Sequence, residues 1–392
     1  MALRSIEIMD TTLRDGEQTS GVSFSVSEKL TIAKLLLEEL NVDRIEVASA
    51  RVSKGELEAV KKITSWATQA NRINQIEVLT FVDDGKSIAW MLESGAKVQN
   101  LLTKGSLNHL THQLKKTPQQ HFKEIAATIT LAASNGIQTN VYLEDWSNGM
   151  RNSKEYVFQY LDFLQTQDIK RLLLPDTLGI LTPKETTDFI SEVHQKYPNL
   201  HIDFHGHNDY DLGVANVMNA IKAGAHGLHL TVNGMGERAG NAPLASVVAV
   251  INDFLPQVKT SIKEKSLYKV SQLVSTFTGF RIPANKPIVG ANVFTQTAGI
   301  HADGDSKKNL YFNDLLPERF GRKRSYALGK TSGKANIVKN LQELGLTLNN
   351  EDLKKVTERI IELGYKKQGV SLRSTMALTD ADCHLGLVFL TG

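Results

Sequence analysis

The stretch Ile6-Glu-Ile-Met-Asp10-Thr-Thr-Leu-Arg14-Asp15-Gly-Glu17-Gln18 decides the fold, because a short apolar run passes directly into a polar loop. Residues 6–9 have the character of a β-strand. Seven further apolar, β-branched-rich runs follow at 44–49, 76–81, 98–103, 139–143, 171–174, 201–204 and 227–232. Segments with a helical period separate these runs, for example 27–40 and 214–223. Eight strand–helix units in about 250 residues predict an α/β fold, a (β/α)8 TIM barrel, although an open doubly wound sheet gives a similar alternation.

The chain changes character after this repeat. Residues 264–278 predict one more helix, and Pro283 and Pro287 then interrupt the pattern. Two helices are expected further on, with Ser332 and Asn350 as their N-caps. We therefore predict three parts: a catalytic barrel over 1–275, a small and mostly helical appendage over 276–364, and a tail over 365–392.

Composition excludes several classes of protein. The 392 residues carry 45 Lys and Arg against 42 Asp and Glu, a formal net charge of +3, which gives no reason to expect a nucleic acid or a membrane surface as partner. A single cysteine, Cys383, cannot form an internal disulfide, so a reducing, cytoplasmic location is expected. Apolar runs all fall short of the ~18–20 residues of a membrane span.

Three ionisable residues at the ends of predicted strands suggest a metal site. Asp15 follows the first strand, and His205 and His207 end the seventh. Residues i and i+2 of a strand share a face, so both imidazoles can reach one ion. Two histidines and a carboxylate suit Mn²⁺, Mg²⁺, Co²⁺ or Zn²⁺. The same set also matches the facial triad of non-haem iron oxygenases, and a surface ion pair between Arg14 and Asp15 is the plainest alternative.

Other strand ends should meet at the same mouth of the barrel. Glu144 closes the fifth strand and Thr177 follows the sixth. The glycine-rich run 234–241 contains G-x-G-x-x-A, but it follows the eighth strand and not the first of a βαβ unit, so NAD binding is not expected. In the appendage, the glycine-flanked loop 296–304 carries His301.

Four motifs taken together resemble the isopropylmalate synthase and homocitrate synthase family, of DRE-TIM metallolyase type. They are DTTLRDGEQ at 10–18, HGHND at 205–209, GMGERAGN at 234–241 and QTAGIHADG at 296–304, and the resemblance extends from about residue 5 to about 364. It implies a Claisen-type condensation of acetyl-CoA with a 2-oxo acid, in a homodimer whose appendage reaches the partner's barrel.

Two segments resemble the citramalate-forming branch of that family. They are 101–106 (LLTKGS) and 141–149 (VYLEDWSNG). This likeness implies pyruvate as the acceptor and (R)-citramalate and CoA as products, the first step of a pyruvate route to isoleucine. A 2-isopropylmalate synthase acting on 2-oxoisovalerate, or a homocitrate synthase, remains an alternative.

The resemblance also implies roles for residues around a metal. Asp15, His205 and His207 would hold Mn²⁺ or Mg²⁺, with Co²⁺ and Zn²⁺ as alternatives, and Asn241 is a further candidate contact. Arg14 would stabilise the developing alkoxide, and both Arg14 and Asp15 would face the substrate.

The remaining implied roles concern the acceptor pocket and proton transfer. Thr177 would hold the pyruvate carboxylate, and Glu144 would assist proton transfer. His301 would be the base that removes a methyl proton from acetyl-CoA, and it would act in trans. Tyr311 would position either His301 or the water that hydrolyses the thioester. The acceptor pocket would be narrowed by Leu79, Leu102 and Tyr142.

The end of the sequence departs from the family pattern. After Gly364 it lacks the family's acidic, Pro-containing linker, and it carries Met376 and Cys383 before an apolar end. A regulatory domain is therefore not expected, which argues against feedback inhibition by isoleucine. A non-catalytic subunit is the third alternative, and the presence of every expected catalytic residue weighs against it.

Overall fold

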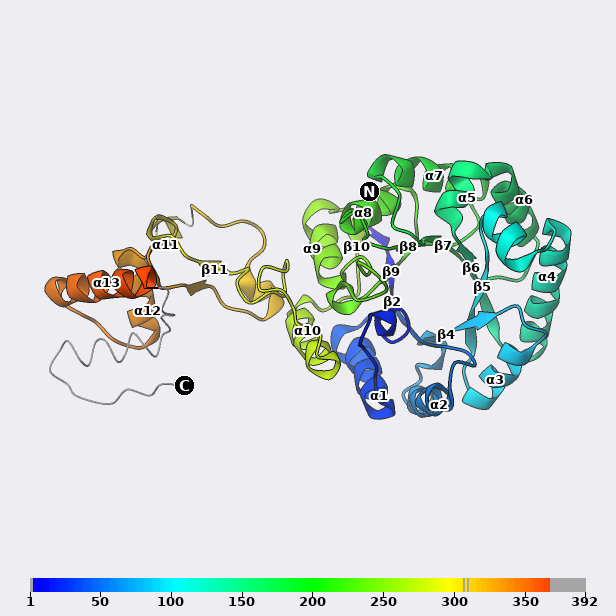
Figure 1. Ribbon diagram of the computed structural model, residues 1–392, viewed down its shortest axis with the longest axis horizontal. Helices are drawn as coiled ribbons and strands as arrows, with labels where there is room; N and C mark the ends of the chain where they lie inside the picture. The colour runs from blue at the N-terminus through cyan, green and yellow to red at the C-terminus, as the bar shows by residue number, and fades with distance from the viewer. Residues whose placement is uncertain (1–2, 306, 309, 367–392) are drawn as a thin grey trace. The chain divides into compact units, whose positions relative to one another are not determined.

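Eight parallel strands close into a barrel in the computed structural model, which describes residues 3–305, 307–308 and 310–366 (Figure 1). In chain order the strands are β2 (Glu7–Asp10), β3 (Arg44–Ser49), β4 (Ile76–Phe81), β5 (Val98–Lys104), β6 (Gln138–Glu144), β7 (Arg171–Asp176), β8 (Ile202–Gly206) and β9 (Gly227–Leu230). Each strand pairs with the next, and β9 returns to pair with β2 from Gly227 to Leu230. The predicted TIM barrel is confirmed.

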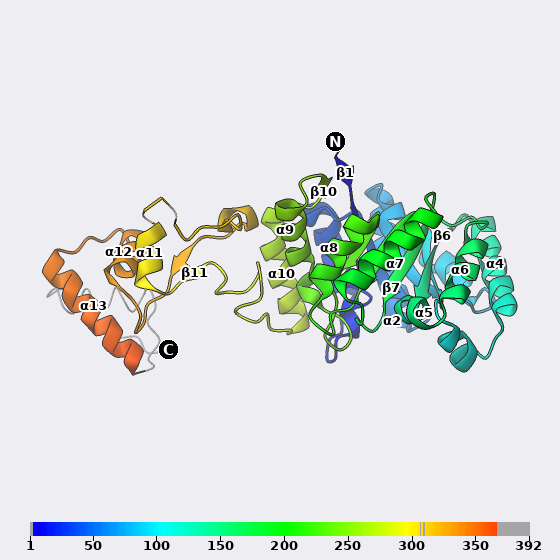
Figure 2. The same cartoon turned by 90° about the horizontal axis from the view of Figure 1, so that it is seen from above.

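Helices surround the barrel in both views (Figures 1 and 2). They are α1 (Val26–Lys34), α2 (Lys54–Gln69), α3 (Lys86–Ser94), α4 (Pro118–Ser134), α5 (Trp146–Asn152), α6 (Lys154–Leu164), α7 (Pro183–Lys196), α8 (Gly213–Ala223), α9 (Leu244–Phe254) and α10 (Glu264–Thr278). Capping boxes begin α1, α4 and α7, because a Ser or Thr side chain and a Glu or Gln three residues on satisfy backbone N–H groups. Local sequence therefore sets where these helices start.

One strand ends earlier than the sequence pattern predicts. β9 stops at Leu230, although the apolar run continues to Val232. Residues Val232–Gly234 form a 3-10 turn (η5) in which Asn233 has a φ of 60°. That left-handed backbone conformation is incompatible with an extended strand, so the chain leaves the barrel wall here.

The barrel interior has an apolar layer and a charged layer. Met9, Leu79, Tyr142 and Leu173 form one buried cluster, with Leu102 packed against it. At the amino-terminal ends of the strands, Arg44 pairs with Glu77 and Asp203, and all three are buried. The barrel is thus a filled core that carries paired charges.

The chain divides into two compact units after Ile282. In its described part the second unit contains the parallel pair β11 (Thr295–Gln296) and β12 (Ser325–Tyr326) and the helices α11 (Gly299–Asp305), α12 (Lys334–Glu343) and α13 (Asn350–Tyr365). Most of the predicted tail, 367–392, lies outside the described residues, and with it Met376 and Cys383.

The two predicted N-caps in this unit were each wrong by one residue. Gly333, not Ser332, precedes α12, and Asn349, not Asn350, caps α13 by accepting a hydrogen bond from the Asp352 N–H at 2.9 Å. The Ser332 hydroxyl instead accepts a hydrogen bond from the N–H of Gly329.

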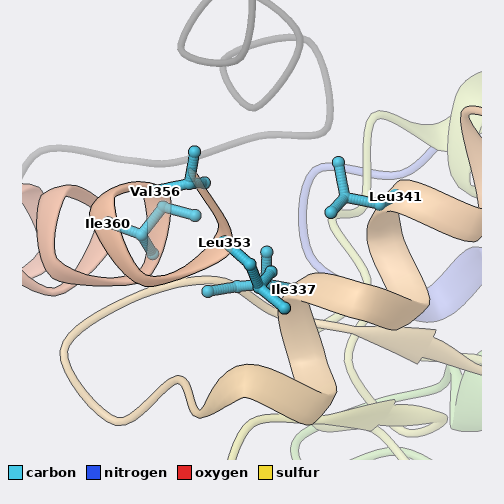
Figure 3. Packing of buried hydrophobic residues seen from close by; sticks show 5 residues of the cluster. All are labelled: Ile337, Leu341, Leu353, Val356 and Ile360. Carbon is cyan, nitrogen blue, oxygen red and sulfur yellow. The ribbon is translucent and has the colours of Figure 1, made fainter. Parts of the chain in front are cut away.

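Packing of α12 against α13 makes the core of the second unit (Figure 3). The buried side chains are Ile337, Leu341, Leu353, Val356 and Ile360. They recur at helical spacing, as an amphipathic helix pair requires.

None of the helices in the described residues combines the length and the hydropathy of a membrane span.

We expect Ile360→Ala to lower the free energy of unfolding of the second unit by roughly 2–5 kcal/mol, because it removes a fully buried side chain and leaves a cavity. Hydrogen exchange of the α12 and α13 amides measures this change. Lys354→Ala, on the exposed face of α13, is the matched control and should change stability by less than about 0.5 kcal/mol. Equal effects of the two substitutions would contradict the packing described here.

Candidate active site

Asp15, His205 and His207 come together at the carboxyl end of the barrel. Nε2 of His205 lies 3.4 Å from Oδ2 of Asp15, and Nε2 of His207 lies 3.9 Å from the same oxygen. Each residue offers one ligand atom, and these three atoms lie within 4.8 Å of one another. All three side chains are buried. Asp15 lies in the loop after β2, His205 lies near the end of β8 and His207 follows that strand, as expected of a TIM barrel.

The backbone at His207 differs from the strand geometry expected for it. β8 ends at Gly206, and His207 makes an isolated antiparallel bridge with Asn241. The turn before Asn241 needs glycine, because its backbone folds closely on itself. A Cβ on Gly240 would lie 1.9 Å from the Gly234 carbonyl oxygen. The turn thereby brings Asn241 next to His207.

The polar atoms of this group fit a divalent cation. Asp15 Oδ1, His205 Nδ1, His207 Nδ1 and Asn241 Oδ1 are all buried and have no hydrogen-bond partner among the described residues, although such atoms are normally satisfied. Burial lowers the pKa of His205 well below its usual value and also lowers that of His207, which favours the neutral imidazole that binds metals. Two imidazoles, a carboxylate and an amide oxygen suit Mn²⁺, Mg²⁺, Co²⁺ or Zn²⁺.

Arg14 is held from three sides. Its Nε lies 2.5 Å from Glu46 Oε2, one terminal nitrogen lies 3.0 Å from Asp15 Oδ2, and the other donates to the Tyr142 hydroxyl at 3.4 Å. Burial opposes the charge of Arg14, but Glu46 and Asp15 outweigh it and raise the pKa. The guanidinium is therefore a fixed cation beside the candidate metal site. Glu46, its partner, is itself held in place by a hydrogen bond from the Asn100 side chain at 2.7 Å.

A cavity of about 160 Å³ opens above these groups. Its walls include every residue that the sequence predicted to contact the acceptor, and also three that the sequence did not assign to the site, Gln18, Pro175 and Glu237. Its lining is Arg14, Asp15, Gln18, Leu79, Leu102, Tyr142, Glu144, Pro175, Thr177, His205, His207 and Glu237.

Two lining residues have polar partners that fix their direction. Glu144, the last residue of β6, pairs with Lys104, the last residue of β5 and its register partner. The Thr177 hydroxyl accepts a hydrogen bond from the Asp145 N–H at 2.9 Å, which leaves its own hydrogen free to donate.

Sequence reasoning missed Glu46, Lys104 and His229. Each is an ionisable residue within or at the end of a barrel strand, and an ionisable side chain in such a place is the signal that could have found it. His229 is fully buried and contacts Tyr142.

His301 and Tyr311 lie together in the second unit. Their ring centroids are 4.3 Å apart, and His301 belongs to α11. The predicted base and its predicted partner are therefore neighbours within the second unit.

Comparison with known proteins assigns both units. Residues 5–274 match the HMGL-like family model, and residues 288–368 match the model described as homocitrate synthase post-HMGL domain-like. The chain belongs to the HMGL-like family. In fold, its barrel resembles the HMG-CoA lyase of Bacillus subtilis, with a TM-score of 0.62 at 19% identity over 72% of this chain and 97% of that one.

Similar curated proteins narrow the family to synthases. The chain is 36% identical to the (R)-citramalate synthase of Methanocaldococcus jannaschii, over 95% of this chain and 74% of the relative. It is 35% identical to the 2-isopropylmalate synthase of Sulfurisphaera tokodaii, over 94% and 93%, and 34% identical to a probable 2-isopropylmalate synthase of Archaeoglobus fulgidus, over 96% and 73%. The resemblance read from the sequence motifs is confirmed at the level of this family of acyl-transferring enzymes.

We expect Asp15→Asn and His207→Ala each to weaken Mn²⁺ binding by about 10-fold or more, because each removes one of the donors that converge at the site. Isothermal titration of the metal-free chain measures the affinity. His112→Ala, which removes an exposed histidine on η4 (His109–Leu114), is the control and should leave the affinity unchanged. Unaltered binding in both site variants would show that the ion binds elsewhere.

Proposed function

We propose that the chain condenses acetyl-CoA with pyruvate and releases (R)-citramalate and CoA, the first step of a pyruvate route to isoleucine. The observation that carries the proposal is the small cavity beside Asp15, His205 and His207, walled by Leu79, Leu102 and Tyr142. That wall leaves room for the methyl group of pyruvate and opposes a branched acid. The citramalate and isopropylmalate synthases among its relatives support the reaction class.

When held by Asp15, His205 and His207, with Asn241 as a further contact, a divalent cation, Mn²⁺ or Mg²⁺, supplies Lewis acidity at the keto oxygen of the acceptor. Thr177 donates its hydroxyl hydrogen to the acceptor carboxylate. Arg14 faces the oxygen on which negative charge develops, and its fixed contacts with Glu46 and Asp15 mean that it need not reorganise during the reaction.

Proton transfers complete the reaction. In this proposal His301 removes a proton from the acetyl methyl group, the resulting carbon nucleophile attacks the keto carbon, and the alkoxide that forms takes up a proton. Water then cleaves the thioester, so that CoA leaves as the thiol. Tyr311 orients the His301 ring, and Glu144, paired with Lys104, assists proton transfer and orients acetyl-CoA. We further propose a homodimer in which His301 serves the barrel of the partner.

A 2-isopropylmalate synthase is the second candidate, because such enzymes are similar to this chain over almost its whole length. The two functions differ in one pocket wall, and a hydrophobic pocket discriminates by only ~1–3 kcal/mol per methylene. Homocitrate synthase is a further alternative within the same family, and we favour it less than 2-isopropylmalate synthase. A non-haem iron oxygenase would instead consume oxygen with Fe²⁺.

In an acceptor panel, we expect thiol release from acetyl-CoA to be at least 10-fold more efficient with pyruvate than with 2-oxoisovalerate or 2-oxoglutarate. Measuring kcat/KM for each acid tests this expectation, and a chelator should abolish turnover in every case. Preference for the branched acid would assign the chain to isopropylmalate synthesis. Oxygen consumption without thiol release would place it in the oxygenase class.

His301→Ala should lower kcat by about 10²–10⁴-fold, the usual contribution of a general base, while Mn²⁺ content stays unchanged. Turnover with pyruvate and metal analysis of the purified chain are the measurements. His112→Ala again serves as the control and should retain full turnover. Near-normal kcat in His301→Ala would show that another group removes the proton.

A further inference from the structure

Three buried side chains, Tyr142, His229 and Asp203, form a hydrogen-bonded relay that leads away from the cavity wall. The Tyr142 hydroxyl is 2.8 Å from Nδ1 of His229, and Nε2 of His229 is 3.2 Å from Oδ2 of Asp203. The three residues come from β6, β9 and β8, and all are buried. Of the three, only Tyr142 lines the cavity, and the hydrogen bond to its hydroxyl links His229 and Asp203 to the cavity wall.

Asp203, at the far end of the relay, accepts hydrogen bonds. Asp203 pairs with Arg44, and its other oxygen lies 3.1 Å from Nε2 of His201. Because the buried guanidinium of Arg44 is always charged, the Asp203 carboxylate paired with it is ionised. An ionised carboxylate has no hydrogen to donate, so Nε2 of His229 must carry the hydrogen between them.

Tyr142, at the near end of the relay, donates its hydroxyl hydrogen to His229 and accepts a hydrogen bond from Arg14. Arg14 has only N–H groups to offer, so the Tyr142 oxygen accepts its hydrogen bond at 3.4 Å. With Nε2 protonated, a neutral His229 has a lone pair at Nδ1, which accepts the hydroxyl hydrogen of Tyr142. This arrangement satisfies every contact, whereas the other neutral tautomer would leave two acceptors facing each other at Asp203.

We propose that His229 and Asp203 are positioning residues that turn the Tyr142 hydroxyl hydrogen away from the cavity and its oxygen toward Arg14. Tyr142 then does two things at once. Its oxygen provides the third restraint on the Arg14 guanidinium, beside Glu46 and Asp15. Its ring presents the acceptor acid with an apolar wall that offers no donor. This inference rests on the proposed function and adds a specificity device to it.

A double-mutant cycle separates positioning from simple packing. We expect His229→Leu and Tyr142→Phe each to lower kcat by about 10- to 100-fold with the acid that the wild-type chain prefers, since a loosened guanidinium is misplaced. KM for acetyl-CoA should not change. Because both act through one hydrogen bond, the double variant should be no worse than the poorer single variant. Multiplying effects would overturn the proposal.

Two matched variants sharpen the cycle. His229→Asn keeps an acceptor close to the position of Nδ1 and should recover part of the kcat lost in His229→Leu. His194→Leu removes a half-buried histidine of α7 and should retain wild-type kcat. No recovery in His229→Asn, together with a lowered kcat in His194→Leu, would mean that any histidine loss disturbs the barrel.

A second measurement does not depend on turnover. Nitrogen-15 NMR of the full chain labelled at histidine reports the tautomer of each ring, and the His229 signals are those lost in His229→Asn. We expect the Nε2–H form in the wild-type chain, with a shift at Nδ1 alone in Tyr142→Phe. An Nδ1–H form or a cation would overturn the relay. If no 2-oxo acid is turned over, the proposed function fails while this result still decides the inference.

Discussion

Oδ2 of Asp15 is the atom on which the site depends. Arg14 donates to it at 3.0 Å, and the imidazoles of His205 and His207 approach it at 3.4 and 3.9 Å. This one buried carboxylate oxygen therefore pairs with a fixed cation and also faces both imidazoles of the candidate metal centre. The position of Arg14 relative to the metal donors therefore follows from a single carboxylate.

The barrel interior accommodates these charges because each arginine is paired with carboxylates. Arg14 and Arg44 each lie between carboxylates, Arg14 between Glu46 and Asp15, and Arg44 between Glu77 and Asp203. Removing one partner of a buried pair leaves an uncompensated charge and commonly costs 3–5 kcal/mol. Catalytic geometry and stability are thus tied together in the same side chains, and the relay through His229 connects the two clusters.

Much of the candidate site could be predicted because it lies at the ends of strands. In a parallel barrel all carboxyl ends meet at one mouth, so Asp15, His205 and Thr177 are brought together once the strands are recognised. The supporting residues Glu46, Lys104 and His229 escaped prediction because their importance depends on a neighbour in another strand. His207 was predicted as part of a strand, yet its place is set by a bridge to Asn241 that no local pattern announces.

By itself, the sequence determined the order of strands and helices and the residues able to bind a metal, because periodicity, capping boxes and strand-end motifs are local properties of the chain. Tertiary structure alone decided which buried groups are partners. Arg14 and Glu46 are 32 positions apart, and Tyr142 and His229 are 87 apart. Such pairs depend on how the strands are staggered when the barrel closes, and that stagger is set by the packing of the whole interior.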